Sequence, residues 1–243
     1  MQARRHRVLG GGDAVKVYIG YDEREWRAAE VCAKSLRAVT NEQIEPEFLC
    51  APKLHAQGLL TRAVDQRGSQ DYDLVSNEYT STRFNISRFL TPILCQQGYG
   101  LFVDCDMIFM EDPRRMTLEV HARHAVSVVM HEHVPAEQYK MVNQRQSTHP
   151  RKNWSSVMLF NCDHEANRRL SLRDVNQRSK YDLHNFYWLA NTEIGSLYPK
   201  WNWLVNVQPK PLSVGIAHFT LGGPFVTGWK GAEYDDLWLE AAK

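Results

Sequence analysis

Two aspartates that flank a cysteine, Asp104 and Asp106, are the sharpest candidates for chemistry in the sequence. They follow the apolar residues 101–103, which predict a buried strand. In an extended segment, residues two apart point to the same side, so both carboxylates should face one way and Cys105 should face the core. Two hard oxygen ligands suit Mg²⁺ or Mn²⁺, above all an ion shared with a phosphate. A strand-end turn with two solvated aspartates is the alternative.

Two arginines precede this pair, in a segment whose apolar spacing predicts a helix over residues 81–97 with a kink at Pro92. Arg83 and Arg88 lie one to two helical turns apart, near enough to bind one anionic ligand. The planar guanidinium group of Arg88 suits phosphate or sugar oxygens. Without the nearby aspartates, a pair of surface salt bridges would explain them equally well.

His131, Glu132 and His133 form the tightest cluster of histidine and glutamate in the chain. Their spacing lacks the H-E-x-x-H pattern of a helical zinc site, and they follow a predicted strand. We therefore expect a loop with polar tips here, not a metal site.

The elements that must position these residues alternate between strands and helices in the first half of the chain. Apolar runs predict strands at residues 14–19, 47–50, 101–103, 125–129 and 157–160, and helical spacing predicts helices at 25–38 and 81–97. Residues 51–80 are polar and rich in turn formers, which predicts a long irregular loop. Such alternation favours an α/β fold with a mainly parallel central sheet flanked by helices, followed by a less regular second half.

The first predicted strand ends in a turn that contains Gly20, Tyr21 and Asp22. In a Rossmann-like half, the turn after the first strand lies beside the ligand crevice, so we expect a nucleotide against Ile19 and these three residues. Gly20 allows close approach of the backbone, Tyr21 can stack on a base, and Asp22 can accept a hydrogen bond from a base or a ribose.

Composition narrows the class of protein. The 243 residues include 43% hydrophobic ones, which suits one globular domain over residues 14–243 behind a loose arm, residues 1–13. A net charge of +1 gives no field that would attract nucleic acid or an anionic membrane, and no apolar run approaches a transmembrane segment. Five widely spaced cysteines and the lack of a secretory signal predict reduced thiols in a cytoplasmic protein.

Further segments extend the pattern around the aspartate pair. They are Ser81–Phe84 and Ser87–Leu90 before it, 151–162 after it, and Ala217–Pro224 with His218 near the end of the chain. With Asp104 and Asp106, these segments resemble metal-dependent glycosyltransferases of the GT-A fold related to family 8, which includes glycogenin and bacterial galactosyltransferases. The resemblance spans roughly residues 15–230, and the segment 151–162, with residues 194–195 and 201–202 behind it, resembles a bacterial and viral branch of these enzymes.

This resemblance implies the fold and the reaction. It implies a Rossmann-like GT-A fold, with an acceptor side in the less regular half, and His218 as a third metal ligand beside Asp104 and Asp106. The metal would be Mn²⁺ or Mg²⁺. The reaction would be hexosyl transfer from a nucleotide-sugar donor, a UDP-sugar, to a saccharide or another hydroxyl acceptor.

The chain departs from the family at two places. Family members often carry a lysine six residues after the histidine, where this chain has Pro224. Lys230, or the backbone around Gly222 and Gly223, would then hold the diphosphate, because successive N–H groups bind phosphate. Ser155 replaces part of an Asn-Ser-Gly run that contacts the donor sugar in the family.

Glu193, in an acidic segment that ends at Gly195, corresponds in the resemblance to the part that contacts the donor sugar and borders the acceptor. We expect its carboxylate to face the reacting sugar, as a general base if the configuration inverts and as an orienting group if it is retained. A solvated turn glutamate is the alternative.

Two rival functions use the same residues. A phosphohydrolase of the haloacid dehalogenase type would use Asp104 as the nucleophile and Asp106 as the general acid. That class places the motif on its first strand, whereas a whole β-α-β region precedes it here. The second rival is a carbohydrate-binding module without catalysis.

Overall fold

The structure of the chain, a computed structural model, describes residues 15–68, 70–131, 151 and 153–243. The expected arm, residues 1–13, and the pair Glu132 and His133 lie outside the described residues. The centre of the fold is a six-stranded sheet in the order β10-β8-β9-β6-β1-β2. Its strands are β1 Val15–Tyr21, β2 Glu47–Cys50, β6 Tyr99–Val103, β8 Val126–Val128, β9 Val157–Asn161 and β10 Ile194–Ser196.

Most of these strands run in one direction. The strand β1 is parallel to both β2 and β6, and β10 is parallel to β8. Only β9 runs the other way within this sheet, antiparallel to both β6 and β8. The carboxyl ends of all strands except β9 therefore lie at one edge, called here the carboxyl edge, and β9 starts there. The expected α/β fold with a mainly parallel sheet is confirmed.

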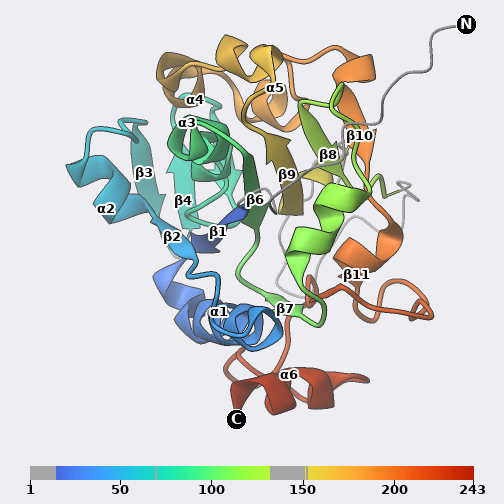
Figure 1. Cartoon of the computed structure of the whole chain (residues 1–243). Helices are drawn as coiled ribbons and strands as arrows, with labels where there is room; N and C mark the ends of the chain where they lie inside the picture. Colours follow the sequence, from blue (N-terminus) through green and yellow to red (C-terminus); the bar gives the residue numbers. More distant parts are fainter. Residues whose placement is uncertain (1–14, 69, 132–150, 152) are drawn as a thin grey trace, which may run out of the picture.

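Helices cover the sheet on both sides (Figure 1). Helix α1, Trp26–Thr40, packs against β1, with an apolar face that includes Ala29, Cys32 and Leu36. Helix α3, Thr91–Cys95, packs against β6 and β9, and the C-terminal helix α6, Asp235–Ala242, packs against α1. The apolar positions of α1 fall on one face because they recur with the helical period.

A second, three-stranded sheet in the order β11-β12-β7 continues from the central one. Its strands are β7 Met107–Phe109, β11 Trp203–Leu204 and β12 Ile216–His218. β7 begins directly after Asp106, and β12 pairs with it antiparallel, with His218 opposite Met107. This pairing brings residues more than a hundred positions apart in the sequence to the same place.

Residues 51–80 are not an irregular loop, so that expectation was wrong. They form helix α2, Ala51–Ala56, and a three-stranded antiparallel sheet of β3 Val64–Arg67, β4 Gln70–Asp73 and β5 Glu78–Thr80. Every residue of β3 is exposed, so this strand lacks the apolar alternation by which half-buried strands are recognised.

The expected helix over residues 81–97 was also wrong in extent. Only the 3₁₀ turn η2, Ser87–Leu90, and the short α3 form in this segment. Pro92 lies in the first turn of α3, where its missing N–H would have had no helical partner. Pro92 therefore marks the start of a helix and does not kink one.

The second half is less regular, as expected, and consists largely of short turns. These are η4 Trp154–Ser156, η5 Glu165–Arg169, α4 Leu172–Gln177, α5 Lys180–His184, η6 Asn191–Glu193 and η7 Pro199–Asn202, with η1 Glu23–Glu25 and η3 Pro113–Leu118 in the first half. Within the described part of the chain, no helix has the length and apolar character that crossing a membrane would require. All five cysteines are free thiols.

Candidate metal centre and nucleotide pocket

Asp104, Asp106 and His218 converge at the carboxyl edge of the central sheet. Each offers one ligand atom, and these atoms all lie within 4.8 Å of one another. The His218 Nε2 atom is 3.3 Å from Asp106 Oδ1. The imidazole is buried, whereas the two carboxylates are partly exposed. The structure therefore brings together the three residues that the sequence nominated, and both aspartates face one side as their spacing predicted.

Backbone pairing fixes this cluster. The Asp104 N–H donates to the Ser156 carbonyl oxygen at 3.0 Å, which extends the pairing of β6 with β9 by one residue. The Phe219 N–H donates to the Asp106 carbonyl oxygen at 2.9 Å, which extends the pairing of β12 with β7. Each aspartate is thus held by a strand from a distant part of the sequence.

The amide of Asn202 sets the proton position on His218. The Asn202 Nδ2 group donates to Ser156 Oγ at 2.9 Å, so the amide oxygen faces His218 Nδ1 at 2.9 Å. An oxygen can only accept, so Nδ1 carries the proton and Nε2 presents a lone pair toward the aspartates. One imidazole lone pair with two carboxylates is a donor set that fits Mn²⁺ or Mg²⁺. Such an outer amide is typical of metal-binding histidines.

Arg88 forms an ion pair with Asp104. Its Nη1 atom lies 2.9 Å from Asp104 Oδ1 and donates to the Ser155 carbonyl oxygen at 2.7 Å. The Arg88 side chain is only 6% exposed and lies over the rings of Phe84 and Phe102. Arg88 thus orients Asp104, a candidate metal ligand. Their separation of sixteen positions in the sequence did not predict this contact. The predicted contact of Arg88 with a donor stays a prediction.

Glu25 is a third carboxylate near the cluster, and our sequence analysis missed it. The Cys105 thiol donates to Glu25 Oε2 at 3.3 Å, on the buried side of the Asp104–Asp106 turn. Burial, and next the negative charge of Asp106, raise the pKa of Glu25 to about 7. Its place three residues after Asp22, at the start of α1, was the available signal, because that loop leaves the carboxyl edge. Cys105 is fully buried, as expected.

The turn after β1 lies at the same edge, with Asp22 buried in it. The carboxylate of Asp22 accepts hydrogen bonds from the Arg24 side chain and from the Arg83 backbone N–H at 3.0 Å. Burial alone would raise the pKa of Asp22, but these bonds outweigh it and lower the pKa. Arg83 itself pairs with Asp71 and with Glu23.

Two neighbours of Asp22 pack against other elements. A Cβ atom on Gly20 would lie 2.4 Å from the Phe84 ring, so the strand needs a glycine there to pack against that ring. The Tyr21 ring lies edge-on to Phe48, with centroids 5.6 Å apart. Ile19 is fully buried in the core.

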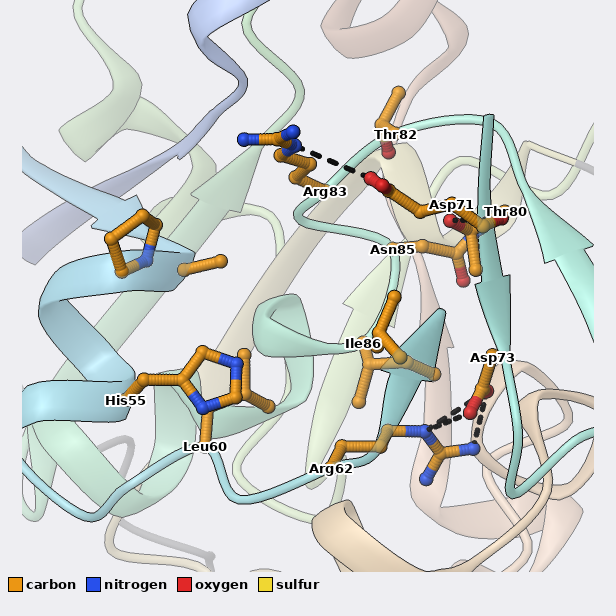
Figure 2. A pocket seen from close by; sticks show the side chains of 13 residues that line it. His55, Leu60, Arg62, Asp71, Asp73, Thr80, Thr82, Arg83, Asn85 and Ile86 are labelled. Atoms are coloured by element: carbon orange, nitrogen blue, oxygen red, sulfur yellow. Dashed lines mark hydrogen bonds and ion pairs between the residues drawn. The ribbon is translucent and has the colours of Figure 1, made fainter. Parts of the chain in front are cut away.

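A pocket opens beside this turn, between α2 and the small antiparallel sheet (Figure 2). Apolar groups form part of its wall, and hydroxyl, amide, imidazole and carboxylate groups form the rest. They are Ala51, Pro52, Leu60, Val64 and Ile86, together with His55, Arg62, Asp71, Asp73, Thr80, Thr82, Arg83 and Asn85. Arg62 is buried and bound to Asp73 through two of its nitrogens, so it braces the pocket.

Ser155 connects the pocket and the cluster. Its hydroxyl lies 2.7 Å from His184 Nδ1, and His184 Nε2 lies 2.9 Å from Asn85 Oδ1, a residue of the pocket wall. The Ser155 backbone carbonyl accepts from Arg88, as described above. The predicted contact of Ser155 with a donor sugar stays a prediction.

The turn after β12 contains the predicted diphosphate residues. Gly222 has a φ of +104°, and its N–H donates to the Phe219 carbonyl oxygen at 2.8 Å. Gly223 is buried, and a Cβ atom there would lie 3.0 Å from the Phe225 ring. Lys230 is exposed. A role for these residues with a ligand stays a prediction.

The structure does not bring Glu193 to the cluster. It immediately precedes β10, whose first residue pairs with Val126 at the start of β8, so it lies at the edge of the sheet opposite the carboxyl edge. Its carboxylate accepts from Arg169 at 3.0 Å and from the Ala190 N–H at 2.8 Å. We expected Glu193 to face the reacting sugar because of its place in the sequence. In the structure, Glu193 lies just before the start of β10 and Asp104 just after the end of β6, so the length of the strands separates them.

His131 is buried, although the expected loop with polar tips, whose other two members Glu132 and His133 lie outside the described residues, stays a prediction. It is 8% exposed and follows β8 at the carboxyl edge. Burial lowers its pKa to about 4, and the nearby imidazole of His218 is the second, smaller cause.

Comparison with known proteins gives one relative of high coverage. The chain is 37% identical over 230 residues to Protein CDI of Arabidopsis thaliana, across 92% of this chain and 84% of that protein. No protein-family model matches the chain.

Several solved glycosyltransferases share the fold. The bifunctional glycosyltransferase WbbM has a TM-score of 0.56 at 14% identity, across 95% of this chain and 50% of that one. GlyE of Streptococcus pneumoniae TIGR4 has a TM-score of 0.54 at 13% identity, across 94% of this chain and 60% of that one. The galactosyltransferase LgtC, solved in complex with donor and acceptor sugar analogs, has a TM-score of 0.53 at 15% identity, across 93% and 95% of the two chains.

The chain thus spans half of WbbM and less than two thirds of GlyE, but almost all of LgtC. These likenesses establish that the fold is the GT-A fold of glycosyltransferases. The narrower assignment to family 8 stays a prediction.

Proposed function

The chain belongs to the family of Protein CDI from Arabidopsis thaliana, and we propose that it is a metal-dependent glycosyltransferase. In this proposal it moves a hexosyl group from a UDP-sugar to a hydroxyl of a saccharide or another acceptor. The observation that carries the proposal is the convergence of Asp104, Asp106 and His218 at the carboxyl edge of a GT-A fold. Ligands of open α/β sheets bind at this edge.

The three residues would hold Mn²⁺ or Mg²⁺. A divalent ion bound there supplies positive charge that stabilises the leaving diphosphate. His218 offers Nε2 to it because Asn202 holds the other nitrogen. Arg88 keeps Asp104 in place through a buried ion pair, so the ligand geometry is set before any ligand binds.

We place the nucleoside of the donor in the pocket beside the turn after β1 (Figure 2). Its apolar wall suits the face of a base, and its polar groups suit the edge of a base and the ribose hydroxyls. Arg83 and the turn Gly20–Asp22 would line the path from this pocket to the metal. Gly222, Gly223 and Lys230 would contact the diphosphate from the other side, and Ser155 would lie near the sugar.

Neither rival function is favoured. The aspartate pair follows β6, a strand preceded by β1, α1 and β2, whereas a haloacid dehalogenase carries its nucleophile on the first strand. The solved structures that share the fold are glycosyltransferases. The five free thiols favour a reducing compartment, so we also propose a cytoplasmic location.

The test is a thermal-shift panel of nucleotides and nucleotide sugars, each with and without Mn²⁺. A ligand at 100 times its dissociation constant adds about 2.7 kcal/mol of stability. We expect UDP and one UDP-sugar to raise the melting temperature only when Mn²⁺ is present. Asp106→Ala should abolish this shift and the Mn²⁺-dependent turnover of the donor.

The matched control is Asp65→Ala, an exposed aspartate on β3, which should keep the full shift. Asp106→Ala with unchanged Mn²⁺–UDP binding in calorimetry would refute the metal assignment. Release of phosphate from phosphomonoesters without any sugar donor would revive the phosphohydrolase.

A further inference from the structure

His131 is anchored between the two elements that support the metal-ligand candidates. Its backbone carbonyl oxygen accepts from Trp154 Nε1 at 3.2 Å, and Trp154 begins η4, the turn that also contains Ser156. Its ring Nδ1 lies 3.2 Å from the amide nitrogen of Gln208, which follows β11. β11 pairs with β12, with Leu204 opposite His218. The imidazole of His131 therefore lies on the same side of the fold as the cluster.

The chemistry of these contacts fixes the proton of the ring. An amide nitrogen can only donate, so Gln208 donates to Nδ1, and the proton of the neutral ring lies on Nε2. The Nε2 atom is buried and has no hydrogen-bond partner among the described residues. A buried donor without a partner destabilises the fold, so its presence calls for a ligand that accepts from it.

A neutral ring follows from the surroundings as well. Burial disfavours a positive charge on the ring and lowers the pKa of His131 to about 4, so the side chain stays uncharged at neutral pH. A neutral N–H suits a hydroxyl or ring oxygen, whereas phosphate oxygens are typically bound by charged donors. The Nε2–H group of His131 is therefore a neutral hydrogen-bond donor that is oriented before any ligand binds and lies beside the candidate metal centre.

We propose that the Nε2–H group of His131 donates a hydrogen bond to an oxygen of the transferred sugar of the donor. This inference rests on the proposed function, since it requires a nucleotide sugar at the cluster. It assigns His131 as a sugar-binding residue that follows β8, opposite the nucleoside pocket on the other side of β6.

The experiment compares two amide variants by calorimetry with Mn²⁺–UDP and with the UDP-sugar selected by the thermal-shift panel. In His131→Asn, the side-chain oxygen can still accept from Gln208, but nothing reaches the position of Nε2. In His131→Gln, an amide N–H lies near the position of Nε2. His164→Gln is the matched control, because His164 caps η5 after the far end of β9.

We expect His131→Asn to weaken binding of the UDP-sugar about 3- to 10-fold, the size of one hydrogen bond, with binding of UDP unchanged. His131→Gln should recover part of this loss, and His164→Gln should bind both ligands as the wild type does. If His131→Asn folds less stably, the comparison still holds, because UDP binding measures the fraction of the protein that is folded.

Three results would overturn the assignment. They are equal losses for UDP and the UDP-sugar, no loss for either ligand, and a change confined to the KM of the acceptor. The first indicates a structural role, and the last places the contact on the acceptor. Failure of the wild type to bind UDP with Mn²⁺ is a different result, because it refutes the proposed function itself.

Discussion

A single amide, that of Asn202, decides which nitrogen of His218 faces the aspartates. Asn202 is fully buried, and its Nδ2 group is held by Ser156, so the amide has no freedom to turn over. Asn202→Leu removes this constraint while it keeps the volume of the side chain similar. We expect Mn²⁺ affinity to fall about 10- to 100-fold, the usual cost of losing such an outer partner. Calorimetric titration with Mn²⁺ in the presence of UDP measures it.

The control for that variant is Asn167→Leu. Asn167 is also buried, but it donates to the carbonyl oxygens of Ala125 and Asn161 at the opposite edge of the sheet. It should lower the melting temperature and leave Mn²⁺ affinity unchanged. Equal losses of affinity in both variants would mean that Asn202 acts through general stability.

Arg88 uses one nitrogen for both Asp104 and the Ser155 carbonyl oxygen. Lysine has a single donor group at the end of a flexible chain, so Arg88→Lys cannot keep the planar contacts of the guanidinium with the two rings. We expect about 10-fold weaker binding of Mn²⁺–UDP and a folded protein, measured by calorimetry and circular dichroism. Wild-type affinity in Arg88→Ala would show that binding of Mn²⁺–UDP does not depend on the contact between Arg88 and Asp104.

The shared direction of Asp104 and Asp106 could be predicted from the sequence, because residues two apart at the end of a strand tend to point to the same side. Glu25 was missed, and His131 was considered only as part of a loop, because their chemistry comes from burial and from neighbours that only the folded chain supplies.

Among the elements, the buried strands were predictable and the exposed ones were not. β1, β6 and β9 consist mainly of buried apolar residues, and their bounds lie within two residues of the prediction. β3 is exposed throughout and mostly polar, and it is held by backbone hydrogen bonds to β4, which the side-chain pattern does not reveal. The position of Glu193 was predicted wrongly for a related reason. The direction in which β10 runs depends on its pairing with β8, which the sequence pattern does not reveal.

The placement of Glu193 makes it a structural residue. It pairs with Arg169 and holds the N–H of Ala190 at the start of η6. Glu193→Ala should cost about 1 kcal/mol, the worth of a side-chain cap with an exposed ion pair, and lower the melting temperature by a few degrees. Calorimetry should find Mn²⁺–UDP binding unchanged. A collapse of sugar transfer with stability intact would restore the role at the acceptor that its place in the sequence suggested.

For the molecule as a whole, two buried ionisable groups near the cluster set opposite limits on the pH range of stability. The pKa of His131 lies at about 4, below its ordinary 6.5, because burial disfavours the charged ring. Its contribution is complete above pH 6.5 and is lost as the pH falls through 4. The pKa of Glu25 lies at about 7, above its ordinary 4.5, again because of burial. Its contribution is complete below pH 4.5 and is lost as the pH rises through 7.

The ionisation of Glu25 sets the upper of these two limits. Between pH 4.5 and 7 the folded chain holds a proton on Glu25 that the unfolded chain releases, so the free energy of unfolding falls with rising pH. Glu25→Gln removes the ionisation and should flatten this fall, by up to about 3 kcal/mol at pH 8 for a shift of this size. Melting curves of the metal-free protein from pH 5 to 8 measure it, with Glu30→Gln, an exposed residue of the same helix, as the control. A divalent cation beside Asp106 favours the ionised carboxylate, so Mn²⁺ with UDP should stabilise the wild type more at pH 8 than at pH 5. The same pH slope in the wild type and in Glu25→Gln would show that Glu25 is already ionised in the folded protein.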